Sequence, residues 1–363
     1  MPKYKYAFAK YPTSSILEEI FEAAESLNNK LSKININDLN VSDYNKRYFG
    51  EHISTLGRRR LNLTKYSYVL AWALNRIERP LNEICFLDYG AGHGFLALLA
   101  KELGIGRVIH NDIYDISCKD AQEIAKELNL TADHYILGDI DDVIFFLDEN
   151  SISCHSVGSY DVIEHIYDIE DFLNKNHLLS KEQISIFHAS AANSKNPRIN
   201  FKLKKIHTKI ENTGRELKKG RKPTDASRPL IEIRKEMIRS LDKNLSKNEI
   251  EDLAYFTRGM MSFDIEKSVD IYEKEKKLPE LINHPTNTCD PITGNWYEHL
   301  MDPDKLSKIL QKNGFNALVI SGYYDSPKSI YIRMIKKFLN LIISFLGKRG
   351  LFFAPFYAIH GFK

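Results

Sequence analysis

The sequence predicts an α/β protein built on a doubly wound, mostly parallel sheet, with N-terminal helices and a helical insertion. Between residues 83 and 194, short apolar runs alternate with segments of helical periodicity, which is typical of βαβ units. Over residues 195–285 the alternation stops, and apolar residues recur only at helical spacing. The α/β pattern then returns over residues 286–327. The sheet is therefore expected to be formed by two separate stretches of the chain.

Individual elements follow from the same periodicities. A helical N-terminal cap covers residues 1–82, with helices expected over 14–31 and 61–77. Core strands are expected near 84–89, 107–112, 134–140, 152–157 and 183–191, helices over 95–104, 118–130 and 302–314, and a terminal strand pair over 316–324. Residues 328–363 are expected to form an amphipathic tail outside the core.

Composition excludes several classes of protein. The chain has 363 residues, with 51 Lys and Arg against 48 Asp and Glu, so its net charge of +3 does not indicate a nucleic-acid binder. Its four cysteines form no CxxC pair, which argues against a zinc ribbon or a disulfide framework. No run of 18 uncharged apolar residues is present. We therefore expect a cytoplasmic protein that does not span a membrane, at the inner face of the membrane if its tail binds lipid.

A glycine-rich turn follows the first core strand. Its glycines, at alternate positions from 90 to 94, remove the Cβ atoms that would block a ligand from the backbone. A dinucleotide fingerprint would need glycine at position 95, where the chain has Phe95, and would not place Asp88 two residues before its first glycine. The turn therefore argues against NAD.

The stretch FLDYGAGHG resembles instead the S-adenosylmethionine (SAM) motif of class I methyltransferases, which have a Rossmann-like fold. SAM has cationic amino and sulfonium groups and no phosphate, so a carboxylate near the turn is favourable. In such a site Asp112 would accept the ribose hydroxyls, and Asp139 would accept from the adenine amino group. The alternative is that each aspartate only caps a helix. The implied cofactor contacts are Asp88, Gly90, Ala91, Gly92, Gly94, Asp112, Ile113, Asp139 and Ile140.

The segment from Asp161 to His165 resembles the D/E-x-x-E-H segment of ubiquinone-biosynthesis O-methyltransferases and small-RNA 2′-O-methyltransferases. In some of those families these side chains bind a divalent cation. The resemblance therefore implies Asp161, Glu164 and His165 as ligands of Mg²⁺ or another divalent metal, with His188 or His299 as a fourth ligand. The alternative is that Glu164 and His165 cap the next helix and line the site.

Methyl transfer to an alcohol needs a group that takes the acceptor's proton. His165 is the predicted base, with Glu164 positioning it, and His188 is the second candidate; either histidine could instead be a core residue. Asn193, in the loop after the fifth strand, and His299 are predicted substrate contacts.

The expected acceptor rests on the regions outside the core. Residues 195–240 contain fifteen Lys and Arg against five Asp and Glu, which suits a phosphate-bearing acceptor or only a solvated face. The overall layout resembles bacterial methyltransferases associated with cell-surface polysaccharide loci, which implies a sugar hydroxyl on a glycan, a nucleotide sugar or another small molecule. An RNA 2′-O-methyltransferase and a non-catalytic SAM-binding scaffold are the alternatives. Nucleic acid is disfavoured because Phe201 is the single aromatic residue of that basic stretch.

The tail carries a second partner prediction. Over 330–346, polar residues fall on one helical stripe and apolar residues occupy the rest, a run too short to cross a bilayer. The pattern predicts either a helix that lies on an anionic membrane surface or one that covers the core or forms a homodimer.

Overall fold

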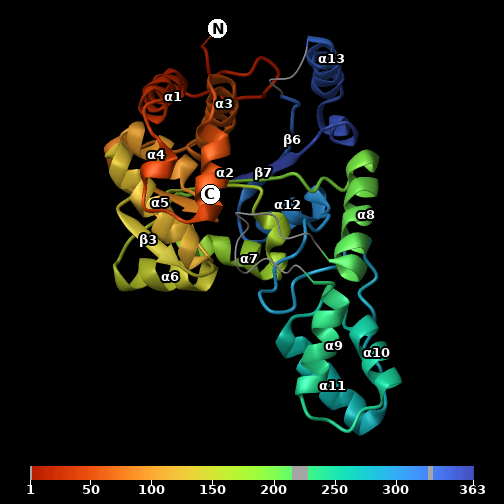
Figure 1. Ribbon diagram of the computed structural model, residues 1–363. Helices are drawn as coiled ribbons and strands as arrows, with labels where there is room; N and C mark the ends of the chain where they lie inside the picture. Colours follow the sequence, from red (N-terminus) through yellow and green to blue (C-terminus); the bar gives the residue numbers. More distant parts are fainter. Residues whose placement is uncertain (1, 215–227, 326–329) are drawn as a thin grey trace.

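The computed structural model describes residues 2–214, 228–325 and 330–363. A seven-stranded sheet in the order β3-β2-β1-β4-β5-β7-β6 runs through the molecule (Figure 1). All neighbours are parallel except β7, which is antiparallel to β5 and β6. This confirms the predicted fold class. The strands are β1 (Cys85–Tyr89), β2 (Arg107–Asp112), β3 (His134–Leu137), β4 (Ser156–Tyr160), β5 (Ser185–Ser190), β6 (Asn316–Ser321) and β7 (Tyr357–Phe362).

Helices cover both faces of the sheet and build the outlying parts (Figure 1). One apolar cluster packs α1 to α5 against one face, and a second packs α6, α7 and α12 against the other. The helices are α1 (Leu17–Leu31), α2 (Asp43–Ile53), α3 (Leu56–Ala73), α4 (Phe95–Glu102), α5 (Asp115–Leu128), α6 (Ile140–Glu149), α7 (Ile169–Lys175), α8 (Pro197–Thr213), α9 (Leu230–Ser240), α10 (Lys247–Phe256), α11 (Ser262–Glu275), α12 (Pro303–Lys312) and α13 (Ile330–Leu346).

The strand order places a ligand site. Chain order reverses beside β1, because the chain steps from β1 out to β3 and then returns to β4 on the other side. In open parallel sheets, ligands bind outside the carboxyl ends of the strands at such a switch point. The glycine-rich turn and the predicted acids lie at or just beyond the carboxyl ends of β1 to β4.

The end of the chain departs from the prediction. Of residues 316–324, only Asn316–Ser321 form a strand, β6, and its partner β7 comes from the predicted tail. Within the sheet, His360 pairs with Phe187 on one side and Leu318 on the other. Residues 328–363 are therefore not a separate tail. The segment YAIHGF was misjudged because its small and polar residues do not alternate as an edge strand would, although Tyr357 to Ile359 are fully buried.

Other elements also differ from the prediction. The fourth strand begins at Ser156 rather than near 152, because the serine-rich run to Tyr160 is buried between β1 and β5. Helix α2 was not expected. The Asp120 carboxylate holds its start, accepting from the backbone N–H and hydroxyl of Ser42 and from the Asn45 amide.

The insertion is helical, as predicted, in the residues that the structure describes. Helices α9, α10 and α11 share their own apolar cluster and project from the main body (Figure 1). The buried Arg234 guanidinium on α9 pairs with Glu211 on α8 and donates through Nε to the Ala254 carbonyl at 2.9 Å. Much of the basic stretch, residues 215–227, lies outside the described residues. No helix within the described ranges is long and apolar enough to cross a bilayer.

The central place of β7 makes a stability prediction. Ala358 is fully buried between β5 and β6, so Ala358→Asp puts an unpaired carboxylate into the sheet. We expect it to lower the free energy of unfolding by about 3 kcal/mol or more, measured by urea unfolding. The control Lys363→Ala removes an exposed side chain with only a long hydrogen bond to the His177 carbonyl and a contact with the Phe315 ring, and should change stability by less than about 1 kcal/mol. An Ala358→Asp protein as stable as the wild type would contradict the placement of β7.

Candidate functional site

The glycine-rich turn leaves backbone open to a ligand. Gly90, Gly92 and Gly94 all have positive φ, between 57° and 75°, which disfavours any side chain. A Cβ on Gly90 would lie 2.5 Å from the side chain of Val162, so this glycine permits the contact with the β4 turn. A Cβ on Gly92 would meet no atom within 4 Å. The turn, with Ala91 between these glycines, therefore borders free space at the end of β1.

Asp112, at the end of β2, holds this turn in place. Its Oδ2 accepts from the Gly92 N–H at 2.8 Å, and its Oδ1 accepts from the Tyr114 N–H at 2.9 Å. The two bonds fix the orientation of the carboxylate, and each oxygen keeps a lone pair for hydroxyl groups. Next to it, the apolar side chain of Ile113 is 43% exposed. A fixed carboxylate beside an open apolar side chain suits a ribose and its base.

Asp88, within β1, connects the strand to the helix that follows the glycine-rich turn. The side chain is buried and its Oδ2 accepts from the Ala97 N–H, in the first turn of α4, at 2.9 Å. Burial raises the pKa of Asp88 to about 8, an effect that the Ala97 hydrogen bond opposes. The predicted free carboxylate is thus a largely protonated group that anchors the glycine turn to α4.

At the end of β3, Asp139 caps α6. Its Oδ1 accepts from the Asp141 N–H at 2.8 Å, while Asp142 Oδ2 accepts from the Asp139 N–H at 2.9 Å. The side chain is exposed and Ile140 is buried. The capping interpretation is therefore correct for Asp139, and the exposed carboxylate still borders the end of β3.

Helix α2 covers the glycine turn through His93. The buried His93 ring lies 5.2 Å from Tyr48, 5.3 Å from Phe49 and 4.8 Å from His52, measured between ring centroids. Burial lowers the pKa of His93 and that of His52, the latter to about 4, so both rings are neutral. The contact is thus an aromatic one, and it joins the N-terminal cap to the site.

In the turn after β4, Asp161 is under the electrostatic influence of Lys65 on α3, which the sequence did not reveal. Asp161 has a left-handed backbone, φ 56°, which is costly for a residue with a side chain and is frequent at functional sites. Desolvation raises the pKa of Asp161. The charge of Glu164 raises this pKa further, whereas the positive charge of Lys65 on α3 lowers it. The Lys65 ammonium lies 4.3 Å from the Tyr160 ring centroid. Nothing in the pattern of α3 distinguished this lysine from a solvated one.

His165 is oriented by a distant segment, residues 284–301, which we call the cover segment. Nδ1 of His165 donates to the Trp296 carbonyl at 2.7 Å. Because a carbonyl only accepts, Nδ1 carries the proton and Nε2 keeps its lone pair in the neutral ring. The described residues provide no hydrogen bond to Nε2. The neutral ring of His165 therefore adopts the tautomer that a general base requires.

The cover segment runs along the β4 turn. Trp296 N–H donates to the His165 carbonyl at 3.1 Å, and His299 N–H donates to the Glu164 carbonyl at 2.9 Å. Asn295 donates to the hydroxyl of Tyr114, beside Asp112. The segment therefore bridges the ends of β2 and β4.

The predicted substrate contact His299 belongs to this cover segment. Its ring is partly buried and stacks on His284 at 4.1 Å, and its Nδ1 donates to the Thr286 carbonyl at 2.7 Å. Burial and the neighbouring His284 lower its pKa to about 4, so the ring is neutral. It remains a candidate contact.

Helices of the insertion hold the cover segment. The Thr288 N–H donates to Nδ1 of His207 on α8 at 3.2 Å, and Arg258 donates to the Thr288 hydroxyl at 2.8 Å. The rings of Trp296 and Tyr167 stack with centroids 5.8 Å apart, and the Tyr167 hydroxyl donates to Asp264 on α11 at 2.6 Å. The insertion is therefore a support for one wall of the site.

Two predicted site residues are structural. His188 is fully buried in β5, where Nε2–H donates to the Asn176 amide oxygen at 3.3 Å and Nδ1 accepts from the Ser159 hydroxyl at 2.8 Å. It has no nitrogen left for a substrate. Asn193 is also fully buried and donates to the carbonyls of Leu351 and Ala354 at 2.8 and 3.0 Å. Neither residue is therefore available as a catalytic or substrate-binding group.

The predicted metal set does not fit a metal ion. Among the described residues, no three His, Cys, Asp or Glu side chains lie close enough together to hold one. Glu164 is buried, and its Oε1 accepts from the Ala191 N–H at 3.0 Å. Burial raises its pKa to about 7. Glu164 instead joins the β4 and β5 turns, so within the described part of the chain Asp161 and Nε2 of His165 lack the third ligand that a metal site needs.

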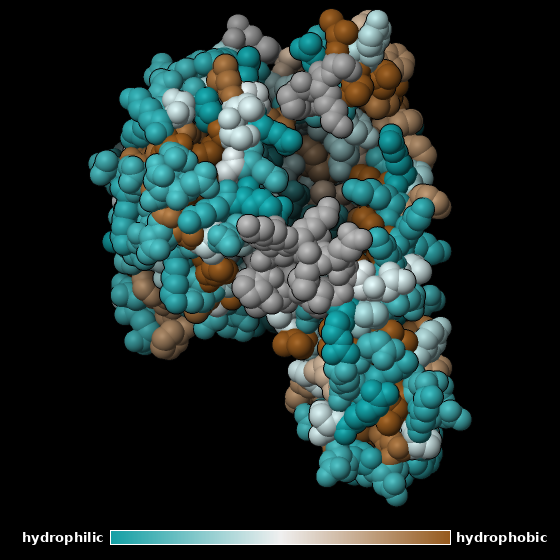
Figure 2. Space-filling view, viewed as in Figure 1, coloured by the Kyte–Doolittle hydropathy of each residue, from teal (hydrophilic) through white to brown (hydrophobic). Residues whose placement is uncertain are grey.

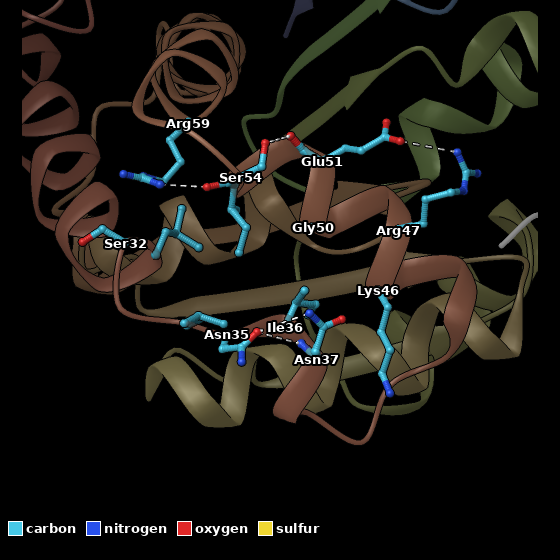
Figure 3. Close-up of a pocket in the computed structure, with 13 residues that line it drawn as sticks. Ser32, Asn35, Ile36, Asn37, Lys46, Arg47, Gly50, Glu51, Ser54 and Arg59 are labelled. Atoms are coloured by element: carbon cyan, nitrogen blue, oxygen red, sulfur yellow. Dashed lines mark hydrogen bonds and ion pairs between the residues drawn. The ribbon is translucent and has the colours of Figure 1, made fainter. Parts of the chain in front are cut away.

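A separate pocket lies on the N-terminal cap. It is lined by residues from 31–37 and from α2, and Figure 3 shows Arg47 and Glu51 pairing at its rim. The Asn35 Oδ1 accepts from the Asn37 N–H within it. None of the predicted site residues lines this pocket, so it does not belong to the site.

A protein family matches part of the sheet and its helices. Residues 87–182 match the family described as "Methyltransferase domain". No curated protein matches the chain.

Solved structures give more distant likenesses. An S-adenosylmethionine-dependent methyltransferase from Listeria monocytogenes is 14% identical over 80% of this chain and 95% of its own, with a TM-score of 0.38. One from Archaeoglobus fulgidus is 16% identical over 80% and 91%, with a TM-score of 0.34. This chain spans about half, 53%, of the Bacillus subtilis YcgJ protein, over 36% of its own length, with 15% identity and a TM-score of 0.29. At such low scores these likenesses say nothing about an acceptor.

Cofactor binding should depend on Asp112. Asp112→Ala would remove the carboxylate expected to accept from the ribose hydroxyls, and it frees the Gly92 N–H, so SAM affinity should fall by about 100-fold or more in calorimetry. Asp115→Ala, which removes an exposed carboxylate three residues later, is the matched control and should bind normally. Unchanged SAM binding by Asp112→Ala, or equal binding of NAD by the wild type, would contradict the site.

The protonation of Asp88 should affect how the free energy of unfolding depends on pH. Its raised pKa means that the folded protein retains a proton that the unfolded chain releases, so Asp88 lowers the free energy of unfolding as pH rises from about 4 to about 8. Asp88→Asn has no such proton and keeps an acceptor for the Ala97 N–H. The stability of Asp88→Asn relative to the wild type should therefore increase between about pH 5 and about pH 8 in urea unfolding. A constant difference would show that Asp88 is ionised in the fold.

Proposed function

Because residues 87–182 form a SAM-dependent methyltransferase domain, we propose that the protein methylates a hydroxyl oxygen, with His165 as the general base. One observation supports this most directly. The Trp296 carbonyl holds the proton of His165 on Nδ1, which leaves Nε2 free to take a proton beside the end of β4. An amine acceptor can lose its proton after transfer, whereas an alcohol needs a base in the transition state.

The chain's residues can hold SAM at the switch point. SAM supplies a methyl group that its sulfonium already activates. Asp112 would accept from the ribose hydroxyls, Ile113 would pack against the base, and the Gly92 backbone leaves room for the amino-acid part. The base at His165 would then take the acceptor's proton as the acceptor oxygen bonds to the methyl carbon and the carbon–sulfur bond breaks.

The charges around this base favour a neutral, polyhydroxylated acceptor such as a sugar. The charge of Glu298 raises the pKa of both Asp161 and Glu164, so three carboxyl groups interact near the proposed base. Carboxylates accept hydrogen bonds from hydroxyls but repel phosphate. A phosphate-bearing acceptor would have to place its charge away from this turn, toward the lysines of α8.

His165 should control turnover without controlling cofactor binding. We expect His165→Ala to lower kcat by about 100-fold to 10,000-fold while the dissociation constant of SAM stays within about threefold. His177→Ala, on the short helix after α7, is the control and should be fully active. The measurement is mass spectrometry of methylated product with a panel of free sugars, nucleotide sugars, glycans and RNA.

The same panel tests the acceptor class. Methylation of neutral sugars or glycans supports the proposal, and methylation of RNA alone would replace it. A His165→Ala protein as active as the wild type would overturn the assignment of the base.

A further inference from the structure

Helix α13 is amphipathic with its apolar side facing outward. Asn340 and Ile343 are its buried residues, and the Asn340 amide accepts from the Tyr324 N–H at 2.7 Å and donates to the Tyr324 carbonyl at 2.8 Å. The most exposed side chain is Phe345, at 90%. The other exposed apolar side chains are Ile330, Tyr331, Ile332, Met334, Ile335, Phe338 and Leu341, all between 38% and 77% exposed. The helix thus turns a polar stripe toward the protein and a wide apolar face toward solvent.

Several contacts fix the helix in this orientation. On its inward stripe, the Lys336 ammonium donates to the Asp325 carbonyl at 2.9 Å, and the Asn340 amide donates to the Tyr6 hydroxyl at 3.2 Å. At its end, the Ser321 hydroxyl of β6 donates to the Gly347 carbonyl at 3.1 Å. A Cβ on Gly350 would lie 2.5 Å from the Ile343 carbonyl oxygen, so the turn after the helix packs closely upon it. The outward apolar face is therefore set by the fold.

The apolar face lies at one extremity of the molecule. In Figure 1, α13 stands at the top, on the far side of β6 and β7 from the projecting helices α9 to α11. Figure 2 shows hydrophobic residues gathered at the same upper right corner. A flat surface could therefore reach this face without meeting the insertion.

The positive charges around α13 indicate which kind of surface its apolar face would bind. Asp325 is the last acidic residue of the chain, and the 38 residues after it contain seven Lys and Arg. Arg333 and Lys337 lie one helical turn apart on an exposed edge of the apolar face, and Lys348 and Arg349 follow the end of the helix. An apolar face bordered by cations is the pattern of helices that lie in the interface of anionic bilayers.

We propose that α13 docks the protein on an anionic lipid bilayer, with Phe345, Phe338 and Met334 inserted among the acyl chains and Arg333 and Lys337 at the phosphate groups. A second copy of the chain fits less well. Pairing two copies through α13 would bring two sets of cations together, and neither helix has an acid to offset them. The proposal does not depend on the identity of the acceptor or on methyl transfer.

Vesicle flotation tests the docking with the full-length protein. Vesicles of phosphatidylcholine with phosphatidylglycerol should carry the wild type, and pure phosphatidylcholine vesicles should carry much less. Phe345→Asp should lower binding to the anionic vesicles by at least about tenfold, since it places a charge in the acyl region. Its control is Phe263→Asp on α11, where the phenylalanine is 72% exposed, and binding should be unchanged.

A second pair of variants isolates the charge. Arg333→Glu with Lys337→Glu should also lower binding at least about tenfold. Lys308→Glu with Lys312→Glu reverses two exposed cations at the same spacing on α12 and should have little effect. Sedimentation velocity and SAM binding establish that every variant is folded.

Two outcomes would overturn the proposal. One is failure of the wild type to float with anionic vesicles. The other is a dimer in sedimentation velocity that Phe345→Asp converts to monomer, which would assign the face to a second copy.

Discussion

The site depends on the pairing of the β4 turn with the cover segment. Two backbone hydrogen bonds join Glu164 and His165 to residues 296–299, and the His165 side chain adds a third through the Trp296 carbonyl. These partners lie about 130 residues apart in the sequence, with the whole helical insertion between them. One contact therefore positions the proposed base, closes one wall of the site and connects the insertion to the sheet. A carbonyl suits this role because it can only accept, so it fixes the imidazole tautomer without competing for the acceptor's proton.

The acids at the strand ends make hydrogen bonds within the protein that shape the site in the absence of a ligand. Asp88 anchors α4, Asp112 holds the glycine turn and Asp139 caps α6. Hydrogen bonds that orient a side chain also prepare it for a ligand, because less conformational entropy is lost on binding. The roles of helix cap and cofactor contact are therefore compatible for Asp139, which caps α6 and stays exposed, while Asp112 orients the glycine turn and Asp88 is a buried support.

Local patterns predicted the fold and the cofactor well. The alternation from β1 to β5 and the glycine turn are encoded over a few neighbouring residues, so sequence spacing reveals them. Pairings between distant segments carry no such signal. β7 was assigned to a tail because its partners are set by tertiary packing, and Lys65 resembles any lysine on a helix until α3 is placed beside Asp161. His188 and Asn193 were misjudged for the same reason, since their partners Asn176 and Leu351 become neighbours only in the fold.

The most direct test of the account is the tautomer of His165. Nitrogen-15 spectra of the histidine side chains, with His165 assigned by comparison with His165→Ala, distinguish a proton on Nδ1 from one on Nε2. For the neutral ring of the ligand-free protein, the structure predicts the Nδ1–H tautomer, whose Nε2 lone pair is available as the base. A neutral His165 with its proton on Nε2 would show that the Trp296 contact does not hold the ring, and it would contradict the proposed mechanism.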